Sequence, residues 1–349
     1  MLGCYGRSEK YRKMGCGSSA EFSDDEPRTV VVFGATGLLG GAVARMLLED
    51  PLRFRVRAVT RRPSSERARK LAEEGAVIVT ANQNDIASLE KAMEGADAMF
   101  LTTHYWEDKN KEKEIVRGLN SIDAAVHKGL THIVYNGSEN VKKSIGRECG
   151  HLDSKAAIEE YLKEVGVNYT IIRLPFWYEN FTTVFRPHQV KYGVYAIPLP
   201  MEDKPLDMIS VADVGECVMN IFCRPRFYSR KIISLAGDRL TMEEIAHVFS
   251  KYVINKKFIC PKIRIKDYEK FDFPGAHELA AMFEFYKNGQ ITRDIKMAKR
   301  LNSNLQSFDK WMDYEAETIE NAIKEGDKEL EITKNTLAVT KETKVNKKK

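Results

Sequence analysis

The sequence predicts an α/β protein with a doubly wound parallel sheet and a smaller, mixed α/β lobe towards the C-terminus. A run of β-forming residues at 29–33 is followed directly by three glycines, each three positions after the last, and then by an amphipathic helical pattern. Beyond this unit, strand and helix patterns alternate as far as residue 173. Such alternation is typical of right-handed β–α–β units and therefore of a parallel sheet.

The elements follow in order along the chain. Gly75 ends one predicted helix, and Asp85 is placed to cap the next. The strand before Asp85, at 76–80, is predicted to be buried. Strands are predicted at 29–33, 54–59, 76–80, 98–101, 131–135, 168–173 and 232–236, and helices at 64–74, 107–128, 242–252 and 277–287. We expect the last of these helices, at 277–287, either to cover a cleft or to face a binding partner.

Composition limits the classes of function. A chain of 349 residues with 43% hydrophobic content can bury a large core. The six cysteines form no Cys-x-x-Cys pair, which favours reduced thiols and no metal site. The formal charge of +5 is mild, and no basic stripe interleaved with aromatics is present, so nucleic-acid binding is not expected. No apolar run has the length of a membrane span, so the expected compartment is the cytoplasm or the nucleus.

The two ends differ in composition from the middle. Residues 1–28 are polar and rich in Gly and Ser, and we expect them to be disordered. Residues 326–349 carry seven Lys against four Asp or Glu and are predicted to form an unpacked tail. Between them we expect a nucleotide-binding domain at 29–174 and the smaller lobe at 175–325, interleaved with it.

One N-terminal motif has two interpretations. The segment from Met14 through Gly15 and Cys16 to Ser19 matches an N-myristoylation signal with a palmitoylation site beside it. That chemistry requires translation to start at Met14, and it would anchor the protein to membranes. The simpler interpretation is a linker of small residues.

The glycine segment predicts a dinucleotide site. Glycines let the backbone turn tightly and approach a pyrophosphate, which the N–H groups of the following helix bind. We expect this Rossmann-type contact from Gly34, Ala35, Thr36, Gly37, Leu38, Leu39 and Gly40.

The next strand predicts which dinucleotide binds. NAD sites place an acidic residue after that strand, whereas Arg61 and Arg62 are found here. Arginine suits a 2′-phosphate, so the expected cofactor is NADP(H), although a solvated basic turn is the alternative. Asn82 and Gln83 are placed to contact adenine. The segment containing Thr102, Thr103 and Tyr105 follows a strand and is expected to line the cofactor pocket.

Several motifs together resemble the NmrA-like family of atypical short-chain dehydrogenases, and most closely its vertebrate redox-sensor type. They are GATGLLG (34–40), VTRRP (59–63), THYWE (103–107), HLDSK (151–155), RLPFWYEN (173–180) and FPGAHELAAMFEFY (273–286). The resemblance covers about residues 29–320. It implies that Pro175, Phe176, Tyr178 and Asn180 lie over the nicotinamide, and a hydrophobic hinge between lobes is their alternative.

The resemblance also bears on catalysis. Catalytic relatives carry a Tyr four residues before a Lys, and His151 stands in the place of that Tyr while Lys155 is present. It implies that Lys155 binds the nicotinamide ribose. Histidine can transfer protons near neutral pH, so His151 and Lys155 are catalytic candidates, but a lost active site is the favoured interpretation. Ser138 follows a strand near the position of the dehydrogenase Ser, and a turn explains it equally well.

Three functions remain in view. The favoured one is an NADPH-binding redox sensor that changes self-association, as a homodimer, or binding to a regulatory protein. The alternative is an NADPH-dependent reductase of a carbonyl or enone that uses Lys155 with or without His151. A lipid-anchored adaptor built on the same fold is the third.

Overall fold

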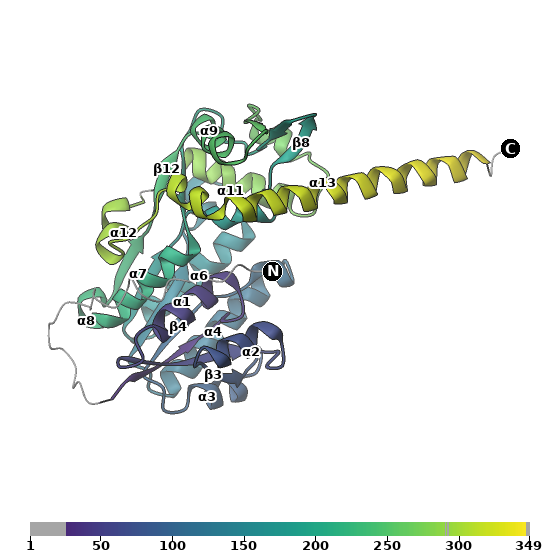
Figure 1. Cartoon of the computed structure of the whole chain (residues 1–349). Helices are drawn as coiled ribbons and strands as arrows, with labels where there is room; N and C mark the ends of the chain where they lie inside the picture. Colours follow the sequence, from purple (N-terminus) through teal and green to yellow (C-terminus); the bar gives the residue numbers. More distant parts are fainter. Residues whose placement is uncertain (1–25, 290, 292, 347–349) are drawn as a thin grey trace.

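The computed structural model describes residues 26–289, 291 and 293–346. The N-terminal Met14–Ser19 motif lies outside the described residues. A seven-stranded parallel sheet forms the larger lobe, in the order β11-β6-β5-β4-β1-β2-β3 (Figure 1). Its strands are β1 (Arg28–Val32), β2 (Phe54–Thr60), β3 (Val77–Thr80), β4 (Ala98–Leu101), β5 (His132–Gly137), β6 (Tyr169–Arg173) and β11 (Lys231–Ser234). This confirms the predicted fold class.

Helices cover both faces of this sheet because its strands alternate their side chains between two cores. On β1, Val30 and Val32 face one core while Val31 faces the other. One face is covered by α1 (Leu38–Leu48), α2 (Glu66–Glu73), α7 (Val211–Cys223) and α12 (Ile295–Leu301). The other is covered by α3 (Ile86–Met93), α4 (Lys111–His127) and α6 (Gly150–Glu164).

Strand β3 corrects one expectation. We expected 76–80 to be a buried strand, but β3 lies at the edge of the sheet, and Val77 is 59% exposed. An edge strand has a neighbour on one side only, so apolar residues alone do not show that a strand is central. Asp85 caps α3 as predicted, with its carboxylate accepting a hydrogen bond from the backbone N–H of Ser88.

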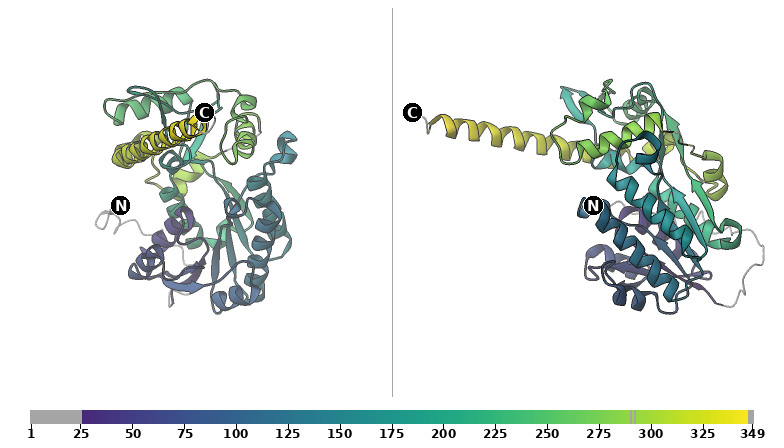
Figure 2. Two further views of the ribbon diagram at one scale, coloured as in Figure 1. Left: turned by 90° about the vertical axis from the view of Figure 1, so that its right-hand side faces the viewer. Right: turned by 180° about the vertical axis from the view of Figure 1, so that it is seen from behind.

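The smaller lobe is mixed α/β and has a core of its own. Two three-stranded sheets, β12-β10-β7 and β13-β9-β8, belong to this lobe. The chain returns to the larger lobe for α7 and β11, so the two lobes are interleaved, as Figure 2 shows from two further sides. The remaining elements are η1 (Tyr105–Glu107), α5 (Val141–Ile145), β7 (Phe176–Trp177), η2 (Tyr178–Thr182), β8 (His188–Lys191), β9 (Val194–Ala196), β10 (Leu206–Ile209), α8 (Pro225–Tyr228), β12 (Asp238–Leu240), α9 (Met242–Tyr252), β13 (Lys257–Ile259), α10 (Ile265–Tyr268), α11 (Ala276–Asn288) and α13 (Phe308–Asn346).

The C-terminal segment is helical: α13 continues to Asn346 and extends away from the body (Figures 1 and 2). That the chain after residue 325 forms an unpacked tail stays a prediction. Its first half is anchored in the core by Phe308, Trp311 and Met312, and the hydroxyl of Tyr195 donates to Asp327 at 2.9 Å. Once a helix is anchored, adding residues avoids the cost of nucleation. Among the described residues, no helix is both long enough and apolar enough to span a bilayer.

Candidate functional site

The glycine segment forms a tight turn between β1 and α1. Gly34 has a φ of +64°, and its carbonyl accepts a hydrogen bond from the N–H of Gly37 at 2.8 Å. A Cβ added to Gly40 would lie 2.4 Å from the carbonyl carbon of Gly34, so only glycine allows this approach of helix to strand. Gly37 caps α1 without a side-chain hydrogen bond, and the first turn has no acidic residue. The turn therefore leaves the positive end of α1 available to an anion.

Arg61 and Arg62 lie just beyond the carboxyl end of β2 and are exposed. The Arg61 guanidinium is bound to the carboxylate of Glu107 in η1. The backbone N–H of Arg62 donates to the Thr60 hydroxyl at 3.1 Å. Arg67, on α2, donates to the Thr36 carbonyl of the glycine segment at 3.3 Å. Cationic groups thus lie beside the end of the glycine loop, and one of them is already paired with a carboxylate.

Asn82 and Gln83 follow β3, as predicted, but their polar groups take part in a local network. The Gln83 side-chain amide donates to the Ser121 hydroxyl at 3.1 Å, and the backbone carbonyl of Gln83 accepts from the Asn120 side chain at 3.0 Å. The Asn82 side chain accepts from the N–H of Asn84 at 3.1 Å. A contact of either residue with adenine stays a prediction.

Lys155 is bound to a buried carboxylate. Its ammonium group pairs with Glu114 of α4, whose side chain is 1% exposed. The hydroxyls of Thr103 and Ser154 also donate to the Glu114 carboxylate. The three donors leave this buried charge well compensated. The ammonium also donates to the Thr103 carbonyl at 3.4 Å and to the Thr103 hydroxyl at 3.5 Å, so its three protons already face acceptors within the protein.

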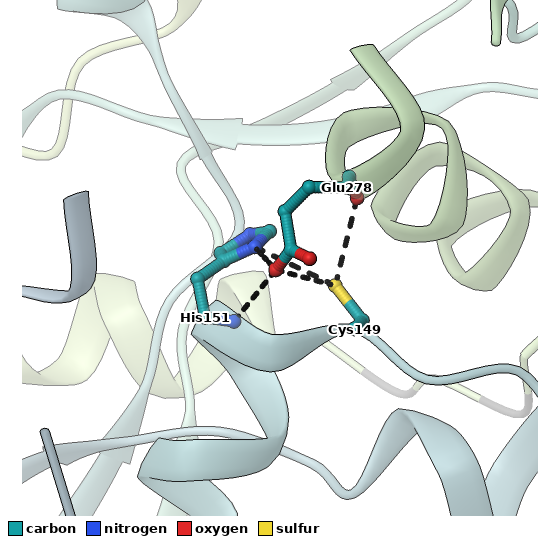
Figure 3. Close-up of side chains that lie close together, drawn as sticks. All are labelled: Cys149, His151 and Glu278. Carbon is teal, nitrogen blue, oxygen red and sulfur yellow. Dashed lines mark hydrogen bonds and ion pairs between the residues drawn. The ribbon is translucent and has the colours of Figure 1, made fainter. Parts of the chain in front are cut away.

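His151 is held from the opposite lobe. One carboxylate oxygen of Glu278, on α11, accepts from the His151 backbone N–H at 2.7 Å and lies 2.6 Å from its Nδ1 (Figure 3). The Cys149 sulfur lies 3.5 Å from the same Nδ1. The His151 ring also stacks at a tilt on Trp106, with ring centroids 5.1 Å apart. The imidazole is therefore fixed by both lobes.

The charges in the cluster formed by Cys149, His151 and Glu278 disfavour a reactive thiolate at Cys149. Burial, with the neighbouring Glu278 and Asp153 carboxylates, raises the pKa of Cys149 far above its usual value. Burial would also raise the pKa of Glu278, but hydrogen bonds from His151 outweigh it and lower that pKa below its usual value. Burial and Glu278 raise the pKa of Tyr105 to about 12. The Cys149 thiol and the Tyr105 phenol are therefore protonated at neutral pH.

Ser138 and Thr102 occupy the carboxyl ends of two central strands. The Ser138 hydroxyl donates to the Glu139 carbonyl at 3.3 Å, and residues 138–140 form an irregular segment after β5. The Asn136 amide donates to the Thr102 hydroxyl at 3.4 Å, joining the ends of β5 and β4. The hydrogen bonds described for Ser138 do not connect it to Lys155 or His151.

The segment 175–180 lies mainly in the core of the smaller lobe. Phe176 is 2% exposed and packs on Phe181 and Phe185. Tyr178 is fully buried and donates to the Gln306 carbonyl at 3.2 Å. Aromatic packing encloses both side chains, as expected for a hydrophobic hinge, and their contact with nicotinamide stays a prediction. Contacts from the backbone of the segment, or from Pro175 and Asn180, stay predictions.

A cavity of about 400 Å³ opens beside the cluster. Tyr105 and Trp106 from η1 form one side of it, and Phe271, Phe273 and Glu278 from the smaller lobe form the other. The space is therefore bounded by the same η1 segment that holds Arg61.

Comparison with known proteins decides the family. The model of the NmrA-like family matches residues 26–333. This chain belongs to the NmrA-like family. An NmrA-like family protein of Dictyostelium discoideum is 29% identical over 296 residues, 82% of this chain and 97% of that one. The NmrA-like oxidoreductase notA of Aspergillus is 29% identical over 300 residues, covering 77% and 85%.

Solved NmrA-like structures share this fold. The negative transcriptional regulator NmrA in complex with NADP superimposes with a TM-score of 0.70 at 19% identity, over 82% of this chain and 95% of that one. Triphenylmethane reductase of Citrobacter, complexed with NADP(H), gives 0.66 at 20% identity, over 85% and 99%. A regulator and a reductase thus have the same fold as this NmrA-like chain.

Three carboxylates escaped prediction from the sequence of this NmrA-like chain. Glu107 pairs with Arg61, Glu114 with Lys155, and Glu278 with His151. Glu107 and Glu278 lie within two of the motifs that carry the family resemblance, and this position in the motifs could have indicated a role in the site. Glu114 lies in a charged helical stretch, where nothing separates a buried glutamate from its solvated neighbours.

Proposed function

We propose that this chain binds NADP(H) and acts as a redox-responsive regulator, not as an efficient enzyme. The glycine turn supports the binding: its backbone packing excludes any side chain at Gly40 and leaves the N-terminus of α1 without a competing carboxylate in its first turn. Arg61 supports the preference for a 2′-phosphate, because a guanidinium forms paired hydrogen bonds with phosphate oxygens. Bound cofactor would supply or accept a hydride. NmrA has been solved with NADP and with NAD, and triphenylmethane reductase with NADP(H), so these relatives support a nicotinamide dinucleotide, and the choice of NADP(H) rests on Arg61.

The observation that carries the regulatory role is the position of η1. On one side Glu107 binds Arg61, and on the other Trp106 contacts His151 and packs against Gly275, at the start of α11. A phosphate on Arg61 would compete with Glu107. Cofactor binding would therefore bias the conformation of a segment that touches both lobes. A partner or a second copy that distinguishes the two conformations would then bind differently, since a ligand shifts an equilibrium only by its differential affinity.

The state of the catalytic candidates supports a non-enzymatic role. His151 replaces the phenol that would donate a proton, and Glu278 fixes its Nδ1. Tyr105, whose phenol ring lies beside His151 with centroids 6.0 Å apart, has a pKa raised to about 12. Proton transfer is most efficient from groups whose pKa lies near the working pH.

The reductase remains the second candidate function, and one observation favours it. Lys155 is present and oriented by Glu114, and the cavity of about 400 Å³ that Tyr105 and Glu278 line is large enough for a small substrate. In that case Lys155 would position the cofactor, and His151 or a water would hold the proton. The NmrA-like oxidoreductase notA shows that some relatives are named as enzymes.

Arg61→Ala tests the cofactor assignment. Loss of a charge-assisted contact of about 1.5–3 kcal/mol should weaken NADPH binding roughly 10- to 150-fold and leave NADH binding nearly unchanged. Calorimetric titration with both nucleotides measures the two affinities. The control is Arg55→Ala, which removes an exposed arginine of the same strand β2. Equal weakening of both nucleotides by Arg61→Ala would show that Arg61 does not bind the 2′-phosphate.

A further inference from the structure

Three side chains that can bind a metal ion converge where α6 meets α11. Cys149 is the N-cap residue of α6, His151 lies in the first turn of that helix, and Glu278 comes from α11 of the smaller lobe (Figure 3). Their ligand atoms, Sγ, Nδ1 and a carboxylate oxygen, all lie within 4.8 Å of one another. We propose that Cys149, His151 and Glu278 form a Zn²⁺ site that links the two lobes.

The distances fit a tetrahedral ion with modest adjustment. Zinc bonds of about 2.0 Å to nitrogen and oxygen and about 2.3 Å to sulfur place neighbouring ligand atoms roughly 3.3–3.5 Å apart. The Cys149 sulfur lies 3.5 Å from the His151 Nδ1 and 3.9 Å from the Glu278 oxygen. The Nδ1 and the oxygen are 2.6 Å apart and share a hydrogen bond, so this pair must open by about 0.7 Å.

The charges and the donor types also suit zinc. A thiolate and a carboxylate together balance the two charges of the ion, and a neutral imidazole completes a set of sulfur, nitrogen and oxygen ligands that zinc accepts. Zinc bonds to the thiolate, so the thiol proton of Cys149 passes to the solvent as the metal–sulfur bond forms. The proton of the His151 Nδ1, where present, leaves in the same way.

The backbone already holds the ligands in position. The Asp153 carboxylate accepts from the N–H of Cys149 at 2.8 Å and from the N–H of Val141 at 2.7 Å, which fixes the cysteine at the start of α6. Supporting contacts of this kind orient metal ligands. Of the three ligands, Glu278 lines the cavity of about 400 Å³, whereas Cys149 and His151 are buried behind it, so an ion would enter past Glu278.

The site has a chemical consequence for His151. Zinc would occupy the Nδ1 that faces Glu278, so that nitrogen would no longer carry a proton. It would also replace a hydrogen bond between α6 and α11 with a coordination bond. Metal binding itself does not depend on the cofactor, and its failure would leave the NADP(H) proposal standing.

Cobalt(II) is the spectroscopic probe for the test. The reduced full-length chain is stripped with a chelator and titrated with Co²⁺ and then with Zn²⁺. We expect one tight Co²⁺ per chain, with a sulfur-to-cobalt charge-transfer band and the intense visible bands of a tetrahedral site, displaced by one equivalent of Zn²⁺. Absence of the charge-transfer band, or weak binding without fixed stoichiometry, would overturn the proposal.

Variants locate the ion. Cys149→Ala should abolish the charge-transfer band, while Cys260→Ala, which removes a half-buried thiol elsewhere, should preserve it. Glu278→Gln keeps the side-chain shape and should weaken Zn²⁺ binding at least tenfold. A band that persists in folded Cys149→Ala would assign the metal to other cysteines, and unchanged affinity in Glu278→Gln would remove Glu278 from the site. Both results would contradict the proposal.

Discussion

At the scale of single residues, three carboxylates hold the side chains that are expected at the cofactor site; one carboxylate is buried, one is half-buried and one is exposed. Glu107, Glu114 and Glu278 pair with Arg61, Lys155 and His151 respectively. The Arg61–Glu107 pair differs from the other two because both side chains are partly exposed, at 54% and 37%. An exposed ion pair is weak, so a phosphate can displace Glu107 at small cost.

Glu107→Gln should therefore tighten NADPH binding. Removing the competing carboxylate frees Arg61, and an exposed pair worth about 0.4–1 kcal/mol corresponds to a roughly two- to fivefold gain in affinity. NADH binding should not change. Glu148→Gln is the matched control, because Glu148 is an exposed carboxylate paired with Lys111 at 2.9 Å. Weaker NADPH binding in Glu107→Gln would show that the carboxylate helps to build the site instead of competing for Arg61.

At the scale of elements, the junction between η2 and α7 depends on a buried acid. Glu179 accepts hydrogen bonds from the Ser210 hydroxyl at 2.9 Å and from the N–H of Val211 at 3.0 Å, at the start of α7. Burial raises the pKa of Glu179 to about 7, although these hydrogen bonds act in the opposite direction. The folded state therefore binds a proton that the unfolded state releases above pH 4.5.

Glu179→Gln should make the free energy of unfolding less dependent on pH. In the wild type, the contribution of this proton is complete below about pH 4.5 and is lost as the pH rises through 7. A pKa difference of about 2.5 corresponds to roughly 3 kcal/mol. Urea unfolding of both proteins at pH 5 and pH 8 measures the effect. Parallel losses of stability in the two proteins would mean that Glu179 does not titrate in this way.

At the scale of the whole molecule, the two lobes are joined by charged contacts around the expected nicotinamide end of the site. Besides the His151–Glu278 pair, Arg147 binds Glu284 at 2.8 Å, and Arg293 binds Glu139 at 2.7 Å. Each of these three pairs joins the part of the chain before residue 152 to the part after residue 270. A change in η1 or α6 on cofactor binding can therefore reach the smaller lobe through contacts that already exist.

Sequence patterns predicted the parallel sheet, the glycine turn and the position of Arg61, because each depends on residues close together in the chain. The partners of the site could not be predicted in this way. Glu278 lies 127 residues after His151, and Lys155 lies 41 residues after Glu114, so only the folded chain brings them together. The same limit explains Tyr178, whose packing against Phe308 and Trp311 encloses a side chain that was expected at the cofactor. It also explains why the helical course of α13 to Asn346 could not be predicted: the core residues that anchor this helix lie in its first half, far from its lysine-rich end.

The central claim is that NADPH is a regulatory ligand of this chain and not a consumed substrate. The most direct measurement combines light scattering of the full chain, with and without NADPH, NADP⁺ or NADH, with an assay of NADPH oxidation against a panel of carbonyl, enone and quinone compounds. We predict tight NADPH binding, a change in the association state and no oxidation. Steady NADPH oxidation that Lys155→Ala abolishes would contradict the claim and make the protein a reductase.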